Sequence, residues 1–210
     1  MTHLPGRVVL FDCDGVLVDS DASVNAAWSR WASEHNLAPE DVMAVVHGRR
    51  SADTVASFVA SPQREQALAR IDRYELAAAA QVGAVHGAAL LLASLPSDAW
   101  AVVTSGRREL ALARLAAAGL PIPRVVVTAD DVRRGKPDPE GYLLAAAELG
   151  VPAAEAIVVE DSPEGIEAAR SAEVGAVLGV GDRALRSAPD VAVPHLEAVR
   201  WDGSGLVIEA

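Results

Sequence analysis

The chain has 210 residues, 51% of them hydrophobic, so it can bury a large core and is not expected to be globally disordered. Its 29 acidic and 18 basic residues give a formal net charge of −11, which argues against a nucleic-acid partner because an acidic surface repels phosphate backbones. No apolar run has the length of a membrane span, and the first residues show no signal-peptide pattern. The single cysteine excludes an internal disulfide, so we expect a cytoplasmic protein. Because no apolar run could span a membrane, we expect no membrane partner.

The first expected element is a short apolar strand over residues 7–11, which ends immediately before Asp12. The region from about residue 21 to 85 contains no convincing strand. Its pattern predicts helices over residues 23–34, 39–46, 52–60 and 64–80. A crossover between strands needs far fewer residues than this. We therefore expect a helical cap domain over residues 19–85, with hinges near residues 18–21 and 82–86, inserted into a core domain formed by residues 1–18 and 86–210.

Strand and helix patterns alternate after residue 86. Apolar runs predict further buried strands over residues 101–103, 125–127, 157–159 and 176–180, and helical patterns cover residues 107–118, 140–149 and 163–171. In the last helix Ser162 is the expected N-cap and Pro163 the first helical residue. This alternation predicts an α/β fold with a doubly wound parallel sheet and right-handed crossovers. The Asp-Gly pair at residues 202–203 lies between two apolar arms and predicts a terminal hairpin.

Short polar motifs lie at the ends of these strands. D-C-D-G (residues 12–15) follows the first strand, T-S-G (residues 104–106) follows the second, and E-D-S (residues 160–162) follows the fourth. A fourth motif, G-K-P (residues 135–137), precedes a helix. Open parallel sheets bind ligands outside the carboxyl ends of their strands, so we expect the motifs to converge on one crevice.

Such a crevice would contain the groups needed for phosphoryl transfer. The carboxylates of Asp12, Asp14 and Asp161 are hard oxygen ligands, for which Mg²⁺ is the expected metal. Donors for a bound anion are offered by Thr104, Ser105, Gly106 and Lys136. Asp12 can attack phosphorus while a metal and a lysine offset the charge on the phosphoryl oxygens. Asp14 can protonate the leaving oxygen and then activate water.

The chain resembles the haloacid dehalogenase superfamily of phosphotransferases, in the subgroup with a helical cap inserted after the first strand. Four motifs carry the resemblance: D-C-D-G-V-L-V-D-S, V-V-T-S-G, G-K-P-D-P and V-V-E-D-S-P-E-G-I-E-A-A. It extends from about residue 8 to residue 180. It implies that Asp12 is the nucleophile and Asp14 the general acid and base. True dehalogenases lack the second aspartate, so Asp14 argues for phosphate esters as substrates.

The same resemblance implies the remaining roles in the core. The phosphoryl group would be bound by Thr104 and Lys136. Mg²⁺ would be held by Asp12, the backbone carbonyl of Asp14 and Asp161, with Glu160 adjacent.

Cap residues select the substrate in this family, and V-H-G-R-R-S at residues 46–51 is the best candidate stretch. Gly48 permits a tight loop between two helices. Either Arg49 or Arg50 can reach the site, and His47 is a further candidate contact, although both arginines could equally be ordinary surface charges. The sequence is most similar to phosphatases of glycerol phosphate and 2-deoxyglucose-6-phosphate. This implies a small phosphorylated sugar or polyol as the substrate; no protein partner can be inferred.

Two alternative functions, a mutase and a receiver domain, fit the sequence less well. β-Phosphoglucomutases share the cap and core but carry a histidine where this chain has Val24, which favours hydrolysis over mutase activity. A phospho-accepting receiver domain is shorter than this chain and lacks an inserted cap, which argues against that alternative.

A cysteine-based phosphatase needs an arginine six residues after its thiol, where this chain has Asp19. We therefore expect Cys13 to face the core as an apolar filler.

Overall fold

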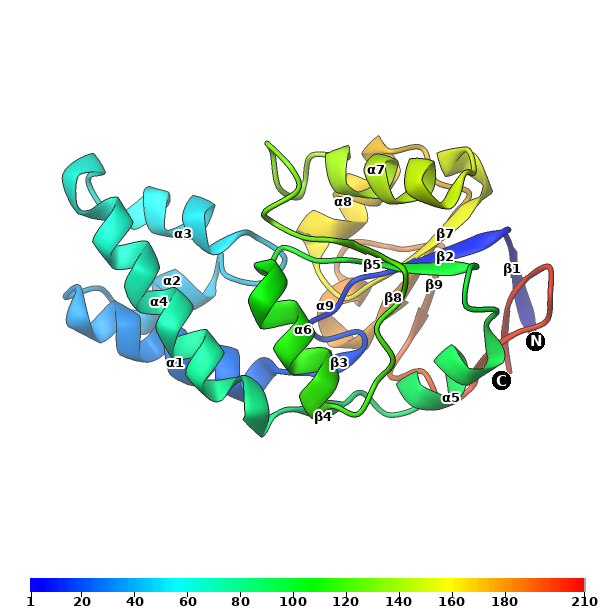
Figure 1. Cartoon of the computed structure of the whole chain (residues 1–210), viewed down its shortest axis with the longest axis horizontal. Coiled ribbons are helices and arrows are strands. Elements are labelled where there is room, and N and C mark those ends of the chain that lie inside the picture. Colours follow the sequence, from blue (N-terminus) through cyan, green and yellow to red (C-terminus); the bar gives the residue numbers. More distant parts are fainter. Residues whose placement is uncertain (210) are drawn as a thin grey trace.

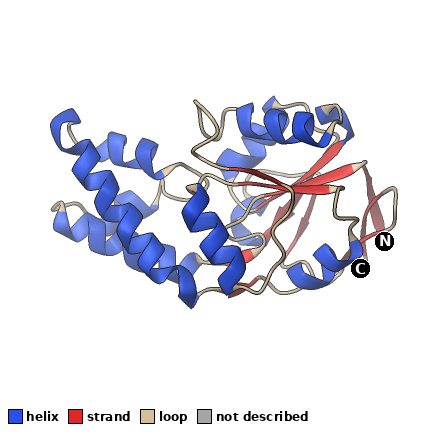
Figure 2. Cartoon of the chain, in the orientation of Figure 1, coloured by secondary structure: helices blue, strands red, loops and turns tan. Residues whose placement is uncertain are grey.

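A six-stranded parallel sheet forms the centre of the molecule in the computed structural model, which describes residues 1–209 (Figures 1 and 2). The strands lie in the order β6 (Val125–Val127), β5 (Trp100–Val103), β2 (Val8–Phe11), β7 (Ala156–Glu160), β8 (Ala176–Val180) and β9 (Val191–Val193). All neighbouring pairs are parallel, which confirms the α/β fold class. The edge strand β9 was not predicted, because it is short and only half-buried.

The central strands bury both faces, as their continuous apolar sequences predicted. In β2, Val9 and Phe11 join one hydrophobic cluster, whereas Val8 and Leu10 join the cluster on the opposite face. Two helices cover the first face: α5 (Ala88–Ser94) and α6 (Arg108–Ala117). Three helices cover the second: α7 (Glu140–Leu149), α8 (Pro163–Ser171) and α9 (Gly181–Leu185).

Helix α8 begins as its sequence predicts. The Ser162 hydroxyl accepts a hydrogen bond of 3.1 Å from the backbone N–H of Gly165, and Pro163 is the first helical residue. This cap directs the helix N-terminus toward the carboxyl end of β7, so the chain places a polar turn at the edge of the sheet.

Four helices within residues 21–78 extend away from the sheet (Figure 1). They are α1 (Asp21–Glu34), α2 (Pro39–Met43), α3 (Ser51–Phe58) and α4 (Arg64–Ala78), with 3₁₀ turns at Ser61–Gln63 and Ala79–Gln81. Their cluster is centred on Trp28, Trp31 and Ile71 and is separate from the two clusters of the sheet. The indole N–H of Trp31 donates to the carbonyl of Ala67 at 2.9 Å, which joins α1 to α4. A separate core supports a cap domain over residues 19–85, and that division stays a prediction.

The chain enters and leaves this helical insertion through two short strands that run side by side. Strand β3 (Val18–Asp19) pairs antiparallel with β4 (Gly83–Ala84). The N–H of Val85 also donates to the carbonyl of Leu17 at 2.9 Å. These contacts fix the spacing of the two connections at the positions where hinges were expected.

A second sheet of three strands lies at the end of the molecule that holds both termini (Figure 1). Strand β10 (Val199–Trp201) and β11 (Gly205–Ile208) form the predicted hairpin, with Gly203 at a φ of 98° in its turn. The N-terminal β1 (Thr2–Pro5) pairs with β11 and was not predicted, because its partner lies at the other end of the sequence. None of the helices within residues 1–209 is both long and apolar enough to cross a membrane.

Candidate active site

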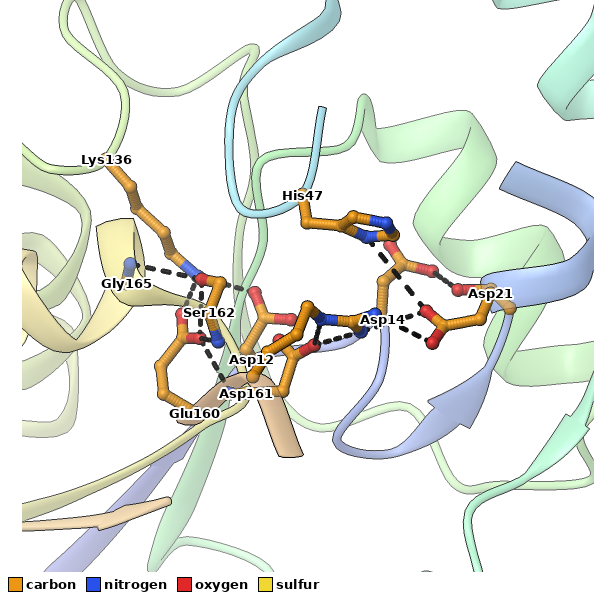
Figure 3. A network of polar contacts seen from close by, with 11 residues as sticks. Asp12, Asp14, Asp21, His47, Lys136, Glu160, Asp161, Ser162 and Gly165 are labelled. Atoms are coloured by element: carbon orange, nitrogen blue, oxygen red, sulfur yellow. Dashed lines mark hydrogen bonds and ion pairs between the residues drawn. The ribbon is translucent and has the colours of Figure 1, made fainter. Parts of the chain in front are cut away.

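The sequence motifs meet at the carboxyl ends of three neighbouring strands, β5, β2 and β7. Asp12 follows β2, Thr104 follows β5, and Asp161 follows β7, in which Glu160 is the last residue. Figure 3 shows the side chains of Asp12, Glu160 and Asp161 together with Lys136, which comes from the loop between β6 and α7. The parallel arrangement thus brings together groups that lie far apart in the sequence.

Lys136 lies between two carboxylates at the base of the site. Its ammonium nitrogen is 2.5 Å from Oδ1 of Asp12 and 2.5 Å from Oε1 of Glu160, and it also donates to the carbonyl of Val103 at 3.1 Å. Burial lowers the pKa of Lys136, but the two adjacent negative charges outweigh burial and hold this pKa well above its ordinary value. Lys136 is therefore a fixed positive charge beside the expected nucleophile.

Glu160, which the sequence placed only beside the expected metal ligands, is the centre of a buried hydrogen-bond network. It is fully buried and accepts from Lys136, from the Tyr142 hydroxyl at 2.8 Å, and from the N–H groups of Asp161 and Ser162 at 2.9 and 3.0 Å. The hydroxyl of Ser162 adds a further bond of 2.9 Å. Burial raises the pKa of Glu160, but the Lys136 charge and these donors outweigh it and lower this pKa.

A small residue in α8 leaves room for this carboxylate. A Cβ atom on Gly165 would lie 1.7 Å from Oε1 of Glu160, so only glycine fits at that position. Sequence reasoning missed both residues. Tyr142 lies outside the four motifs, and Gly165 lies inside the last motif but its contact with Glu160 follows from how α8 packs beside β7.

Three carboxylates lie close enough to share a cation. Candidate ligand atoms of Asp12, Glu160 and Asp161 are all within 4.8 Å of one another. Burial, and then the charge of Glu160, raises the pKa of Asp161 to about 7. Burial and three neighbouring carboxylates also raise the pKa of Asp12 well above its ordinary value, although Lys136 opposes them. Crowded, buried oxygen ligands of this kind fit a divalent metal ion, which would offset their repulsion.

Arg183 from α9 is a second cation beside this cluster, and no sequence motif pointed to it. Its guanidinium contacts Oδ2 of Asp161 and forms two bonds, of 2.8 and 2.9 Å, with Asp21 at the start of α1. Gly15 lies close by with a φ of 82°, and a Cβ there would be 2.3 Å from Asp161. Arg183 thus connects the acidic cluster to the first helix of the insertion.

The carboxylate of Asp14 is held by two donors on one oxygen. Its Oδ1 accepts from the Ser20 hydroxyl at 2.7 Å and lies 3.0 Å from Nη1 of Arg114 in α6. The other arm of Arg114 is 3.4 Å from Glu75 of α4, whose second oxygen accepts from Ser51 at 3.1 Å. Arg114 therefore joins the expected acid and base to the helical insertion, and neither Arg114 nor Glu75 was found from the sequence.

The T-S-G loop lies where expected but precedes its helix by a short turn. Helix α6 begins at Arg108, so the N–H groups of Ser105 and Gly106 lie before it rather than in its first turn. The Gly106 N–H donates to the hydroxyl of Thr104 at 3.0 Å, and the Ser105 hydroxyl donates to the carbonyl of Gly48 at 2.7 Å. The loop thus contacts the helical insertion directly.

Residues 46–49 form a loop over the carboxyl edge of the sheet, and a cavity lies between this loop and that edge. From this loop His47, Gly48 and Arg49 line the cavity. The other wall contains the sequence-predicted residues Asp12, Asp14, Thr104, Ser105, Gly106 and Asp161. Gly48 has a φ of 78°, and a Cβ there would lie 2.4 Å from the Ser162 hydroxyl, so glycine permits this close approach.

Arg50 lies outside that cavity, unlike its neighbour. Its guanidinium forms bonds of 2.7 and 3.0 Å with Asp53 and donates at 3.0 Å to the carbonyl of Arg133. These contacts join α3 to the loop before Lys136. Of the two candidate arginines, the structure places Arg49 on the cavity and Arg50 on this bridge.

Cys13 faces the core, as expected. Its side chain is fully buried in the cluster that contains Phe11 and Val16. Burial, followed by the charges of Asp14 and Asp12, raises the pKa of the thiol well above its ordinary value. A protonated and inaccessible thiol cannot serve as a nucleophile.

Comparison with known proteins identifies the family. A model described as haloacid dehalogenase-like hydrolase matches residues 7–173. Among curated proteins, the chain is 45% identical over 162 residues to hexitol phosphatase A from Escherichia coli K12, covering 75% of each chain. It is 37% identical to validoxylamine A 7′-phosphate phosphatase from Streptomyces hygroscopicus subsp. limoneus, covering 95% of this chain and 98% of that protein.

Further similarities agree with this result. Glycerol-1-phosphate phosphohydrolase 2 from Saccharomyces cerevisiae is 31% identical, with 94% of this chain and 85% of that protein covered. Among solved structures, a hydrolase from Pseudomonas syringae superposes with a TM-score of 0.82 at 27% identity, covering 91% of this chain and 94% of that chain. The resemblance inferred from the motifs is confirmed.

Proposed function

The chain belongs to the haloacid dehalogenase-like hydrolases, and from that premise we propose that it is a Mg²⁺-dependent phosphatase of small sugar or polyol phosphates. The observation that carries the proposal is the placement of Asp12. Its carboxylate lines the cavity, 2.5 Å from the Lys136 ammonium and among further carboxylates. All three relatives are named as phosphatases, two of them for hexitol and glycerol-1-phosphate, which supports this substrate class.

In the proposed reaction, an Asp12 oxygen attacks phosphorus and forms an aspartyl phosphate, while Asp14 donates a proton to the leaving oxygen. Asp14 then takes a proton from the water that hydrolyses this intermediate. Thr104, the N–H groups of Ser105 and Gly106, and Lys136 hold the phosphoryl oxygens. Mg²⁺, held by Asp12, Asp161 and the backbone carbonyl of Asp14, would offset charge on those oxygens.

The cap loop is proposed to select the substrate. Arg49, with His47 and Gly48, borders the cavity and is the candidate contact for substrate hydroxyl groups, whereas Arg50 holds the loop over the core. Arg49→Ala should raise KM for the best polyol phosphate with a smaller change in kcat. The matched control is Arg73→Ala, since Arg73 is an exposed arginine of α4 that does not line this cavity.

The decisive assay is phosphate release from a panel of phosphate monoesters. The panel contains glycerol, tetrose, pentose, hexose and polyol phosphates and phosphoglycolate, each with and without Mg²⁺. Asp12→Asn should abolish release and leave the fold intact, whereas Asp19→Asn, an exposed aspartate of the same motif, should leave it largely unchanged. Robust turnover by Asp12→Asn would overturn the assignment.

One residue argues against the mutase alternative, although a β-phosphoglucomutase is among the solved structures that share this fold. Val24 lines the cavity at the position where the mutases carry a histidine. Incubation with β-glucose 1-phosphate and a bisphosphate activator should therefore give free phosphate and not glucose 6-phosphate.

A small phosphorylated metabolite as substrate and a single, buried cysteine support a cytoplasmic location for the protein.

A further inference from the structure

Three metal-ligating side chains meet near the second hinge connection, outside the cavity around Asp12. Candidate ligand atoms of His86, His195 and Glu197 all lie within 4.8 Å of one another. Nε2 of His86 is 3.1 Å from one carboxylate oxygen of Glu197, and Nδ1 of His195 is 3.9 Å from the other. We propose that these three residues bind a Zn²⁺ ion at a site separate from the catalytic carboxylates.

The backbone holds the two contributing segments together without a metal. The Leu196 N–H donates to the carbonyl of His86 at 2.9 Å, and the Leu196 side chain is fully buried. Gly87 has a φ of 88°, and a Cβ there would lie 2.2 Å from the backbone nitrogen of Glu197. This close approach fixes the backbones of the three residues relative to one another, so only their side chains need ordering on binding.

One ligand atom of the cluster has no other partner. Nδ1 of His195 is buried and forms no hydrogen bond within the described residues. The His195 ring lies 5.0 Å from the His86 ring, between centroids. Buried polar atoms are normally paired, and an ion in the space between the three side chains would supply the missing partner.

The ligand set favours zinc over magnesium. Two imidazoles and one carboxylate suit Zn²⁺ and leave a fourth position for water, whereas Mg²⁺ prefers oxygen ligands. Ligand atoms around a tetrahedral zinc lie about 3.4 Å apart. Nε2 of His86 lies 3.1 Å from one oxygen of Glu197, close to this value, whereas Nδ1 of His195 lies 3.9 Å from the other oxygen, so side-chain rotation must bring one carboxylate oxygen near both rings. Bound zinc would join the chain leaving the helical insertion to the loop before β10.

The test uses the untagged full-length chain in excess Mg²⁺, so that the catalytic carboxylates are occupied. Zn²⁺ should bind with a stoichiometry of one by isothermal titration calorimetry and raise the melting temperature. Co²⁺ in its place should give the intense visible absorption of a tetrahedral site. His86→Ala, His195→Ala and Glu197→Gln should each weaken zinc binding by at least about tenfold and remove this absorption.

His3→Ala provides the matched control, because His3 is a partly exposed histidine paired with an aspartate outside the cluster. It should bind zinc as the wild type does. His86 is exposed, so His86→Ala should fold, and its circular dichroism spectrum checks this. Unchanged zinc affinity in His86→Ala and Glu197→Gln, or a cobalt spectrum without tetrahedral bands in the wild type, would overturn the proposal. Phosphatase activity plays no part in either outcome.

A second inference concerns Arg114 and rests on the proposed function. Arg114 Nη1 and the Ser20 hydroxyl both contact Oδ1 of Asp14, and no hydrogen bond within residues 1–209 reaches Oδ2. Oδ2 is therefore the oxygen that can carry a proton to the leaving group. We infer that Arg114 is a positioning residue that directs Oδ2 toward the cavity, and that Glu75 steadies the guanidinium from the helical insertion.

Leaving groups of different basicity separate this role from a structural one. An alkyl phosphate needs its leaving oxygen protonated, whereas p-nitrophenyl phosphate does not. Arg114→Met should therefore lower kcat/KM for glycerol phosphate about 100-fold or more while changing that for p-nitrophenyl phosphate far less. Arg114→Lys should restore part of the alkyl phosphate activity, since the ammonium can still reach Asp14.

Arg108→Met is the matched control, because Arg108 lies in the same helix and its side chain is partly exposed. It should affect both substrates little. An equal loss on both substrates in Arg114→Met and Arg114→Lys would overturn the positioning role. A wild-type protein inert toward every ester would instead overturn the proposed function itself, which is a distinguishable result.

Discussion

Glu160→Gln probes the buried network that holds the candidate nucleophile. The substitution keeps the shape of the side chain but removes the charge that lies 2.5 Å from Lys136. It also places an amide N–H₂ among donors that now all point at a carboxylate. Breaking a buried ion pair by removing one partner costs about 3–5 kcal/mol. Because Lys136 keeps Asp12 as a counter-charge, we expect a loss of about 3 kcal/mol in the free energy of unfolding.

The measurement is urea unfolding at neutral pH, followed by circular dichroism and tryptophan fluorescence. Glu155→Gln is the control, because Glu155 pairs with Arg7 at 2.6 Å but its side chain is 41% exposed. Exposed pairs contribute about 0–1 kcal/mol, so this control should stay close to the wild type. Phosphate release by Glu160→Gln should also fall by about 10- to 100-fold, since Lys136 and Asp12 lose their orientation. If the two variants unfold at the same urea concentration, the network does not hold the site together.

Three further predictions concern other buried positions. Gly165→Ala should destabilise the fold and reduce activity because its Cβ would collide with Glu160, whereas Gly83→Ala, with open space around it, should not; thermal unfolding compares them. Burial raises the pKa of Glu75, so folding favours the protonated form of this carboxyl group. The free energy of unfolding of the wild type, relative to that of Glu75→Gln, should therefore fall as pH rises above about 4.5. If urea unfolding gives the same difference in free energy between the wild type and Glu75→Gln at every pH in this range, the reasoning is wrong. Cys13→Ala should keep most phosphatase activity, and complete loss with the fold preserved would contradict its assignment to the core.

Local patterns were sufficient for most elements of the fold. The helices α7 and α8 span the residues predicted for them, since apolar spacing in both, and a capping serine and first-turn proline in α8, act within a few residues. Strands β1 and β9 were missed, because each is short, lacks a continuous buried run and is held by its pairing with β11 or β8 rather than by a local pattern. Helix α2 ends at Met43, three residues before the predicted end, where the chain turns toward the loop over the site.

The reaction class could be read from the sequence alone, because the catalytic motifs are short, contiguous and placed at the ends of recognisable strands. The sequence also predicted that Cys13 faces the core, and the structure shows its side chain fully buried. Only the tertiary structure decided which charges surround these motifs. Arg183, Arg114 and Glu75 reach the site from helices far away in the chain, and their positions follow from how those helices pack. It likewise separated Arg49 from Arg50, since adjacent residues of a loop point in different directions once the loop is fixed against the core.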